Sequence, residues 1–484
     1  MPEVPPGSPT RPVPLCVDMD GTLILTDVLW ESMMQLLKKD PLYLFALPWW
    51  LLGGRARLKR EIAARVELDV AALPYNHEFV EFLRAEHRQG RSLILATAAD
   101  ETLAQRVAQH VGVFSDVLAS NGDTNLRGSN KVRVLTERFG AGKFDYAGNS
   151  TVDLPVWKDS RQAIVVNAPK GLAQKAAALT QVGQVFNEKR SVGSPLLAAL
   201  RPHQWVKNLI IFVPLLTSHN LADRHSLIAA GMAFLAFCCC ASGVYVLNDL
   251  LDLEADRHHP KKRLRPFAAG RASIPSGFAL VVGSLALSAF ITAWLPLRFT
   301  YVLGLYLVLT TSYSWRFKQV ALVDVFCLAG LYSVRLVAGH AATGIQYSFW
   351  LLAFSMFIFL SLALVKRFTE LQGLRQQNKQ QSIGRGYSAA DLELVAMLGV
   401  ANGFLAVLVM ALYVNSEAVT QLYHGHSKVL LGVCPLLLYW ISRVWLIAHR
   451  GRMHDDPIVF ALKDRVSYLI GAATVTVMWL ATVH

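Results

Sequence analysis

The chain has 484 residues, of which 53% are hydrophobic and only 17% are charged. Because an average globular protein carries about 25% charged residues, a single water-soluble globule does not fit this composition. The net charge of +13 does not require a nucleic acid as partner, and we expect none, since Lys and Arg also gather in the cytoplasmic loops of membrane proteins.

The first half of the chain is predicted to alternate short strands with helices. Residues 1–12 are rich in proline and are expected to be a disordered leader, without the apolar stretch of a signal peptide. Helices are expected over most of 27–90, over 100–111 and from residue 131 onward, and strands over 13–17, 92–97, 144–147 and 163–166. This alternation predicts a doubly wound α/β domain over 13–186, followed by a linker over 187–200.

One segment of this half is unusually apolar. Residues 41–52 read PLYLFALPWWLL, and Pro48 interrupts the run. A transmembrane helix needs about 20 apolar residues, so this run is too short to span a bilayer. Two interpretations stay open: a helix buried in the protein core, or an interfacial segment with its tryptophans at the level of the lipid headgroups.

The second half, residues 201–484, is predicted to be an all-α polytopic membrane domain. It holds about nine apolar segments, at approximately 205–217, 226–247, 273–295, 298–313, 319–340, 348–365, 392–414, 428–448 and 466–482. With the first half in the cytoplasm, the cytoplasmic loops hold about 17 Lys and Arg and the outer loops about 2, in agreement with the positive-inside rule. We therefore expect an integral protein of the inner (plasma) membrane with its active sites facing the cytoplasm and its C-terminus outside.

The second apolar segment runs into the sequence NDLLDLEAD. On a helix, Asn248, Asp252 and Asp256 share one face, and Asp249 flanks it. Carboxylates this close repel one another unless a cation lies among them, and carboxylates together with phosphate groups suit Mg²⁺. The residues that follow add a basic group made up of Lys261, Lys262, Arg263 and Arg265. The pattern fits a magnesium–diphosphate ligand, and the alternative is a charged surface loop without a ligand.

Further polar residues lie at the ends of other apolar segments or inside them. Asp324 and Arg335 are eleven residues apart, about three helical turns, so they are expected to point the same way. For each residue alone, snorkelling to the membrane interface or an internal ion pair is the alternative to ligand binding. The candidates for substrate binding in this set are Lys207, Asn208, Tyr313, Lys318, Arg335, Lys366, Arg367 and Glu370.

The pattern NDxxDxxxD, with a second polar motif, KRFTEL, after the sixth apolar segment, resembles the UbiA superfamily of intramembrane prenyltransferases over roughly 195–484. Ordinary aromatic prenyltransferases carry a second Asp-rich motif, whereas KRFTEL offers one acid and two bases. Together with RPHQWVKN, HPKKRLRPFAAG and LYSVRLVAG, this motif resembles the decaprenyl-phosphate phosphoribosyltransferase branch. The resemblance implies phosphoribosyl diphosphate as donor, a polyprenyl phosphate as acceptor, Mg²⁺ held by Asp249, Asp252 and Asp256, and phosphate binding by the basic residues.

The sequence Asp18-x-Asp20-Gly21-Thr22, after the first strand, resembles the haloacid dehalogenase-like (HAD-like) phosphatases over about 13–185. Thr97, Lys131 and the stretch GNSTVD follow in the family's order. The resemblance implies a Rossmann-like HAD domain with a helical cap. In it, Asp18 is the nucleophile, Asp20 the general acid and base, Thr97 a donor to the phosphoryl oxygens and Lys131 a counter-charge. The implied Mg²⁺ ligands are Asp18, the carbonyl of Asp20, Asn149 and Asp153.

Many members of this family carry Asp where this chain has Asn149. Asn is neutral and a weaker Mg²⁺ ligand than Asp, so a catalytically silent domain is the alternative to an active phosphatase. The ordered set of DxDGT, Thr97 and Lys131 favours activity.

Together the motifs suggest a bifunctional enzyme. It would transfer 5-phosphoribose to a polyprenyl phosphate, release diphosphate, and then remove the 5-phosphate to give polyprenylphosphoryl ribose, a precursor of lipid-linked arabinose in cell wall biosynthesis. Residues 41–52, where the phosphatase family usually places a cap, are expected to lie against the membrane and guide the lipid-linked phosphate to Asp18.

Two alternatives stay open. One is a prenyl-diphosphate-using enzyme of an aromatic or quinone pathway, with a degenerate or unrelated HAD domain. The other is a transporter or receptor that uses the polar spans as a pathway; a transporter should show repeats of interrupted helices, and the sequence shows none clearly. The sequence does not specify the length of the polyprenyl chain. It is compatible with a monomer and with a homo-oligomer.

Overall fold

In the computed structural model, the chain packs into two compact units. The first contains Met1–Leu200 and Tyr245–Val281, and the second contains Arg201–Val244 and Val282–His484. The structure describes residues 12–483 except 122–124, 188–192, 219–220, 378–384, 417–418, 420–422, 424–426, 454–455 and 462. The predicted leader therefore lies outside the described residues, apart from its last residue. The end of the predicted linker forms helix α9 (Gly193–Leu200).

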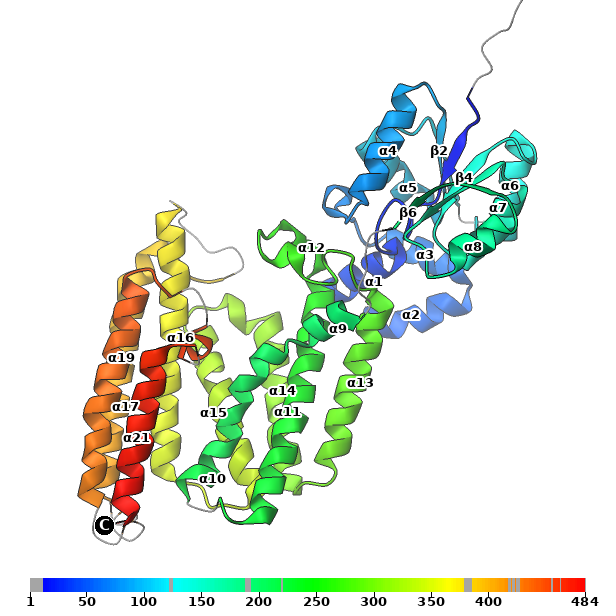
Figure 1. Cartoon of the computed structure of the whole chain (residues 1–484). Helices are drawn as coiled ribbons and strands as arrows, with labels where there is room; N and C mark the ends of the chain where they lie inside the picture. Colours follow the sequence, from blue (N-terminus) through cyan, green and yellow to red (C-terminus); the bar gives the residue numbers. More distant parts are fainter. Residues whose placement is uncertain are drawn as a thin grey trace, which may run out of the picture. The chain divides into compact units, whose positions relative to one another are not determined.

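A six-stranded parallel sheet forms the centre of the first unit (Figure 1). Its strands lie in the order β3-β2-β1-β4-β5-β6. They are β1 (Leu15–Val17), β2 (Leu93–Asp100), β3 (Asp116–Ser120), β4 (Asp145–Gly148), β5 (Gln162–Val166) and β6 (Gln181–Phe186). The strand order reverses at β1, which pairs with both β2 and β4. In open α/β sheets, ligands bind beyond the carboxyl ends of the strands at such a reversal.

The strands form because their side chains are buried on both faces. All residues of β1 and β4 and most of β2 and β5 are buried, and continuous apolar runs of this kind are typical of central parallel strands. The four predicted strands are confirmed. β3 and β6 were not predicted, because their short sequences DVLAS and QVGQVF remain largely half-buried or exposed at the two edges of the sheet. The helices outside the cap are α5 (Glu101–Val111), α6 (Ser129–Phe139), α7 (Leu154–Asp159) and α8 (Leu172–Ala177).

The cap lies between β1 and β2. Its elements are α1 (Val28–Lys39), α2 (Tyr43–Leu52), α3 (Arg55–Ala63), η1 (Val70–Ala72) and α4 (His77–Arg88). Helix α1 begins at an Asp27 N-cap, whose carboxylate accepts hydrogen bonds from the backbone N–H groups of Leu29 and Trp30. The expectation of a mainly helical segment over 27–90 is thus confirmed.

Helix α2 contains the apolar run, which is partly buried and partly exposed. Trp50 is only 8% exposed and packs with Leu36 and Ile62 in a small core. Phe45 and Trp49, in contrast, are 80% and 69% exposed. The helix is therefore anchored by one tryptophan and presents the other to its surroundings.

The first unit also includes the segment that follows the long helix α11 (Arg224–Leu251). It consists of α12 (Leu253–His258), η4 (Lys262–Leu264) and the first turns of α13 (Ile274–Thr292). The N-terminal phosphatase-like part and the acidic motif are therefore described within one unit.

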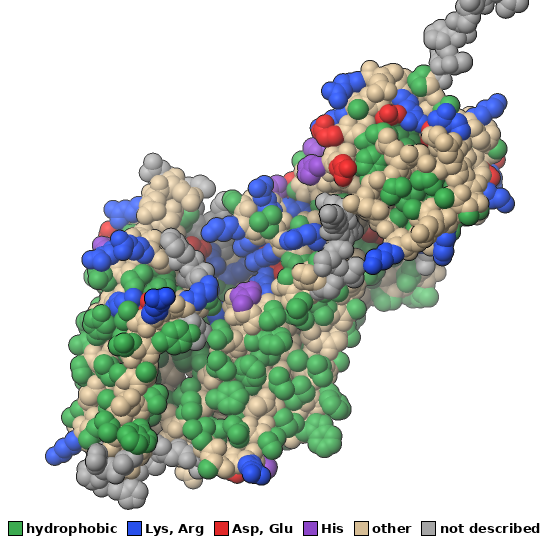
Figure 2. Space-filling view, in the orientation of Figure 1, with side chains coloured by type: hydrophobic (Ala, Val, Ile, Leu, Met, Phe, Trp, Pro, Cys, Tyr) green, Lys and Arg blue, Asp and Glu red, His purple; other side chains and the backbone are tan. Residues whose placement is uncertain are grey.

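The second unit is a bundle of helices. Its elements are η3 (Pro202–Phe212), α10 (Val213–Thr217), most of α11 and of α13, α14 (Leu297–Trp315), η5 (Phe317–Gln319), α15 (Val323–Thr343), α16 (Phe349–Gln376), η6 (Ala389–Asp391), α17 (Leu392–Val414), η7 (Ser427–Gly432), α19 (Val433–His449), α20 (Pro457–Ala461) and α21 (Arg465–Val483). Hydrophobic side chains cover the length of the bundle in the view of Figure 2.

Among the described residues, seven helices are long and apolar enough to cross a membrane, so the expected count of about nine is not confirmed. The predicted span at 205–217 forms instead the 3-10 helix η3 followed by the five-residue helix α10. The predicted span at 298–313 forms α14, which has 19 residues but is not among the seven.

Small residues let the helices of this unit approach closely. A Cβ atom on Gly399 of α17 would lie 2.0 Å from the ring of Trp445 on α19, and one on Gly339 of α15 would lie 2.2 Å from the carbonyl oxygen of Ile211. Close packing at small residues is the usual basis of helix association in membranes. This packing brings together polar side chains that lie far apart in the sequence.

Candidate active sites

The phosphatase-like residues gather at the carboxyl ends of β1, β2 and β4. Asp18 and Asp20 follow β1, Thr97 lies in β2, and Asn149 follows β4. Lys131 comes from α6, and its Nζ donates to Oδ1 of Asp18 over 2.8 Å. The predicted motif residues thus occupy one edge of the sheet, and the predicted nucleophile Asp18 is in contact with its predicted counter-charge Lys131.

Tyr146 connects Lys131 to the acidic end of β4. Its hydroxyl lies 2.8 Å from the Nζ of Lys131 and 3.1 Å from Oδ1 of Asp153. The other oxygen of Asp153 accepts hydrogen bonds from the backbone N–H groups of Asn149 and Ser150, at 3.0 and 2.9 Å. Sequence reasoning missed Tyr146, because an inward-facing aromatic residue on a central strand gives no signal of a polar role.

Burial raises the pKa of both Asp18 and Asp20. It raises the pKa of Asp18 to about 6, an effect that Lys131 opposes and Asp153 reinforces. It raises the pKa of Asp20 well above its ordinary range, with Asp27 adding to the effect. Oδ1 of Asp20 also accepts a hydrogen bond from the backbone N–H of Val28, over 2.9 Å. A carboxyl group with a raised pKa is suited to donate a proton to a leaving group.

The donor set fits Mg²⁺. Asp18, Asp153 and the amide oxygen of Asn149 are hard oxygen ligands, which Mg²⁺ prefers, and Lys131 balances only one of the two carboxylates. Two glycines leave room for these groups. A Cβ on Gly21 would lie 1.9 Å from the amide nitrogen of Asn149, and one on Gly148 would lie 2.7 Å from a carboxylate oxygen of Asp153.

These residues line a cavity of about 960 Å³. Asp18, Asp20, Lys131, Asn149 and Asp153 lie in its wall, whereas Thr97 does not. Thr97 is fully buried, and its hydroxyl accepts a hydrogen bond from the backbone N–H of Ala99. Two basic residues that the sequence did not single out, Lys59 of the cap and Arg127, also line the cavity.

Much of the remaining wall is apolar. Leu44, Leu47, Pro48 and Leu51 of α2 line the cavity, and so do Ser273, Ile274 and Pro275, where α13 begins. Since α13 is one of the seven candidate membrane spans, the cavity reaches from the predicted catalytic carboxylates to the start of a candidate membrane span.

The acidic motif departs from the single helical face that the sequence predicted. Helix α11 ends at Leu251 and α12 begins at Leu253, with Asp252 between them as N-cap. Nη1 of Arg265 lies 3.0 Å from Oδ1 of Asp249 and 2.6 Å from Oδ2 of Asp256. Asp252 lies instead within 2.7 Å of the Nζ of Lys38, on the cap helix α1. Two carboxylates therefore share Arg265, and the third has its own cation.

The carboxylate oxygens of this motif are donors of the type that a divalent cation such as Mg²⁺ prefers, although each is paired with a basic side chain in this structure. Asp249 and Asp256 are buried, and buried carboxylates require opposite charge nearby. Arg265 supplies that charge for both, and Lys38 does so for Asp252. The predicted basic residues Lys262 and Arg263 are exposed beside the motif.

In the second unit, Lys207, Lys366 and Asp456 form a group that we call the lysine cluster. Oδ2 of Asp456 lies 2.9 Å from the Nζ of Lys207 and 3.2 Å from that of Lys366. The sequence missed Asp456, whose only signal is an acidic residue before Pro457 in a basic loop. Two lysines on one carboxylate leave a surplus of positive charge, which suits a phosphate group.

Asn208 and Arg335 lie deeper in the bundle. Oδ1 of Asn208 accepts a hydrogen bond from Nε of Arg335 over 2.8 Å, and Nη2 of Arg335 lies 3.3 Å from the hydroxyl of Tyr306. Asp324 and Arg335 lie on the same helix, α15, but have different partners: Arg335 bonds to Asn208, and Asp324 pairs with Arg367.

Asp324 belongs to a second group, the buried ion-pair cluster, with Arg367 and Tyr387. Arg367 pairs with both Asp324 and Glu370, and the hydroxyl of Tyr387 donates to Oδ1 of Asp324 over 2.7 Å. Arg367 and Asp324 are almost completely buried. The neighbours Lys366 and Arg367 therefore belong to different clusters.

The predicted residue Tyr313 is connected to this cluster through Arg385. The hydroxyl of Tyr313 accepts a long hydrogen bond of 3.4 Å from Arg385, whose Nε lies 2.9 Å from Oε1 of Glu370. Lys318 is half-buried in η5.

Comparisons with known proteins agree with this division of the chain. The model of the UbiA prenyltransferase family matches residues 211–463, and the model of the haloacid dehalogenase-like hydrolases matches residues 15–158. The protein "Uncharacterized protein y4nM" of Sinorhizobium fredii is 39% identical over 96% of this chain and 90% of its own length.

Two further relatives carry functional names. "Nodulation protein NoeC" of Azorhizobium caulinodans is 36% identical over 58% of this chain and 90% of its own length. A "Decaprenyl-phosphate phosphoribosyltransferase" of Mycolicibacterium smegmatis is 34% identical over 61% of this chain and 92% of its own length. The chain belongs to the UbiA prenyltransferase family and carries a haloacid dehalogenase-like domain at its N-terminus.

Proposed function

We propose that the chain is a bifunctional enzyme of lipid-linked ribose synthesis. Its UbiA part transfers 5-phosphoribose from phosphoribosyl diphosphate to a polyprenyl phosphate, and its HAD-like part removes the 5-phosphate. The first step is supported by the relatives that are named decaprenyl-phosphate phosphoribosyltransferase. The product would be polyprenylphosphoryl ribose, a precursor of lipid-linked arabinose.

In the transfer, the bond between C1 of ribose and the diphosphate oxygen breaks, and an oxygen of the lipid phosphate forms the new bond to C1. Asp249, Asp252 and Asp256 would hold Mg²⁺, which neutralises charge that develops on the leaving diphosphate. Lys207 and Lys366 would bind phosphate groups of the substrates. Because Arg367 already pairs with two carboxylates, those of Asp324 and Glu370, we assign it a structural role.

In the hydrolysis, Asp18 attacks the 5-phosphate and forms an aspartyl phosphate, while Asp20 donates a proton to the departing ribose oxygen. Asp20 then takes a proton from the water that cleaves the intermediate. Lys131 holds Asp18 and balances the phosphoryl charge. Mg²⁺, when bound by Asp18, Asn149 and Asp153, would offset the repulsion between the carboxylates and the incoming phosphate.

The observation that carries the proposal is the composition of the phosphatase cavity. The same wall contains the catalytic carboxylates, the apolar side of α2 and the start of the candidate membrane span α13. A soluble phosphomonoester needs only the first of these. A phosphate on a lipid needs all three, because its headgroup cannot travel far from the bilayer.

The exposed apolar side chains of α2 support a position at the membrane surface. Leu44, Phe45, Trp49 and Leu52 are all exposed, and large exposed apolar patches on soluble domains mark interaction sites. Tryptophan is enriched at the membrane–water interface. The phosphatase part would thus meet its lipid product at a high effective concentration.

Contacts within the first unit support the proposed topology. Because Lys38 and Asp252 form an ion pair, the N-terminal part and the loop after α11 lie on one side of the membrane, which the positive-inside rule assigns to the cytoplasm. Since α11 crosses once, the chain has to cross once more before it, and η3 with α10 is the segment available. Counting α14 as well, we infer nine crossings and an external C-terminus.

A reconstituted transfer assay tests the proposed substrates. Purified protein in lipid vesicles should release diphosphate from phosphoribosyl diphosphate only when a polyprenyl phosphate is present. If it instead consumes prenyl diphosphate with an aromatic acceptor, the chain is an aromatic prenyltransferase and the proposal is wrong.

A further inference from the structure

One face of the cap helix α1 lies against the acidic motif. Glu31, Gln35 and Lys38 are spaced four and three residues apart and so lie on the same side of the helix. Glu31 pairs with Arg257, Gln35 with Glu254, and Lys38 with Asp252. The two segments therefore run in opposite directions along this contact. The helix of the phosphatase part and the motif of the transferase part are therefore joined by three polar pairs within the first unit.

The pair at one end of this contact is buried. The two guanidinium nitrogens of Arg257 lie 3.1 and 2.5 Å from the two carboxylate oxygens of Glu31. Nε of Arg257 also donates to the carbonyl oxygen of Ala268 over 2.9 Å. A buried charge requires its partner, so this pair fixes the position of α12 against α1.

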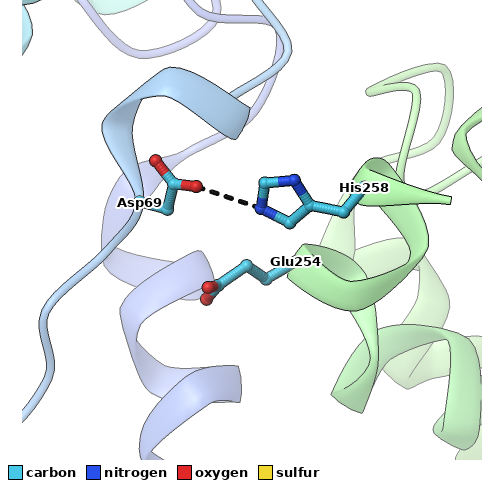
Figure 3. A group of neighbouring side chains, drawn as sticks. All are labelled: Asp69, Glu254 and His258. Carbon is cyan, nitrogen blue, oxygen red and sulfur yellow. Dashed lines mark hydrogen bonds and ion pairs between the residues drawn. The ribbon is translucent and has the colours of Figure 1, made fainter. Parts of the chain in front are cut away.

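A second contact lies beside it. His258 on α12 faces Asp69 in the cap, with 3.0 Å between Nε2 and Oδ2, and Glu254 lies next to them (Figure 3). The ligand atoms of these three residues lie within 4.8 Å of one another. His258 is exposed, and Glu254 already accepts a hydrogen bond from Gln35, so we assign this group to the contact between cap and motif rather than to a cation.

Helix α1 touches a carboxylate of each proposed site. In its first turn, the backbone N–H of Val28 donates to Asp20 of the phosphatase. In its last turn, the Nζ of Lys38 lies 2.7 Å from Asp252 of the transferase motif. A helix of 12 residues is about 18 Å long, so one short, stiff element connects the two.

We propose that α1 positions the acidic motif and that Lys38 is the counter-ion that Asp252 exchanges for the catalytic divalent cation. The proposal rests on the proposed function, in which Asp252 is a ligand of that cation. Lys38 competes directly for the carboxylate, and its positive charge also opposes the approach of a cation. Both effects weaken the binding of a cation at Asp252. The phosphatase part therefore lowers the cation affinity of the transferase motif.

The size of the effect follows from the exposure of the pair. Lys38 and Asp252 are 45% and 31% exposed, and ion pairs of this kind change an equilibrium by a factor of about two to five. Loss of Glu31 should act in the opposite direction. Arg257 would then lose its buried partner, α12 would shift, and the carboxylates would no longer converge on a cation.

Binding of Mn²⁺, followed by the electron paramagnetic resonance signal of the free ion, tests the proposal directly. The measurement uses the full-length protein in lipid nanodiscs. It is made in an Asp18→Asn background, which removes a ligand of the phosphatase cation. Lys38→Met is compared with Lys39→Met, because Lys39 is its neighbour on α1 and contacts the carbonyl oxygen of Arg65 rather than the motif.

The proposal predicts that Lys38→Met lowers the dissociation constant for Mn²⁺ about two- to fivefold, that Lys39→Met leaves it unchanged, and that Glu31→Gln raises it. The Mg²⁺ concentration for half-maximal transfer should shift in the same directions. Equal binding by the Lys38→Met and Lys39→Met variants, or weaker binding by Lys38→Met, would overturn the proposal.

Asp249→Asn in the same background separates this inference from the proposed function. If Asp249→Asn weakens Mn²⁺ binding while Lys38→Met has no effect, only the role of Lys38 is wrong. If Asp249→Asn leaves Mn²⁺ binding unchanged, the cation site itself is wrong, and the inference is overturned with it.

Discussion

The phosphatase cavity and the polar clusters of the helical bundle are built in different ways. In the cavity, the functional side chains follow strands of one parallel sheet, and the topology of the sheet brings their ends together. In the bundle, the lysine cluster and the buried ion-pair cluster combine residues from separate helices and loops, such as Lys207 with Asp456 and Asp324 with Arg367. The residues of a site at the edge of a parallel sheet can therefore be predicted from short sequence motifs. In a helix bundle, the residues that contact one another can be identified only when the packing of the helices is known.

The difference extends to the roles of neighbouring residues. In the sheet, Asp18 and Asp20 are two residues apart and both line the cavity. In the bundle, Lys366 and Arg367 are adjacent, but one joins the partly exposed lysine cluster and the other is buried in an ion pair. Adjacent positions on a helix are about 100° apart. The first two residues of KRFTEL, Lys366 and Arg367, therefore point in different directions and enter different clusters.

The largest expected effect concerns the sheet-borne site. Asp18→Asn removes the nucleophile and should lower phosphomonoester hydrolysis by about a thousandfold or more. Phosphoribosyl transfer should stay unchanged, because Asp18 has no role there. Hydrolysis of a soluble phosphomonoester and release of diphosphate, measured on the same preparation, check both statements. Asp159→Asn, on the same domain and outside the cavity, is the control, and normal hydrolysis by Asp18→Asn would refute the assignment.

The next effect concerns the acidic motif. Asp249→Asn should lower transfer by about a hundredfold or more, because loss of one carboxylate weakens both cation binding and stabilisation of the leaving diphosphate. Hydrolysis by the HAD-like part should continue at the normal rate. Asp223→Asn is a matched control, since Asp223 immediately precedes the opposite end of α11. Transfer at wild-type rates by Asp249→Asn would show that the motif holds no catalytic cation.

A third pair of variants separates stability from activity in the bundle. Arg367→Met leaves Asp324 buried without its main partner, which should lower the free energy of unfolding by about 3–5 kcal/mol. Lys366→Met should lower it by less than about 1 kcal/mol and instead weaken phosphate binding. Thermal unfolding in detergent and the KM for the donor check the two predictions. Equal stability of the two variants would contradict the separate assignments.

The smallest effect concerns the exposed side of α2. Replacement of Phe45 and Trp49 by Ser should slow hydrolysis of a lipid-linked phosphate by at least about tenfold, because both side chains lose apolar contact with the membrane. Hydrolysis of a soluble phosphomonoester should not change. Leu179→Ser, at another exposed apolar residue of the domain, should affect neither substrate. An equal loss on both substrates would mean that α2 belongs only to the folded core.

The sequence predicted the parts of the molecule that depend on local patterns. The four central strands, the cap helices and the positions of Asp18, Asp20 and Lys131 follow from apolar runs and short motifs. The partners of Asp252 and Asp324 did not follow, because Lys38 and Arg367 are distant in sequence and meet them only through tertiary packing. The split of the acidic motif at Asp252 was missed for a different reason, because the regular spacing of its carboxylates favours an unbroken helix.

The central claim is that one chain makes a lipid-linked ribose phosphate and then dephosphorylates it. Mass spectrometry of lipids from vesicles that contain the protein, polyprenyl phosphate and phosphoribosyl diphosphate tests this claim most directly. The wild-type protein should accumulate polyprenylphosphoryl ribose, and the Asp18→Asn variant should accumulate the same lipid with the 5-phosphate still attached. Identical lipid products from the two proteins would contradict the account.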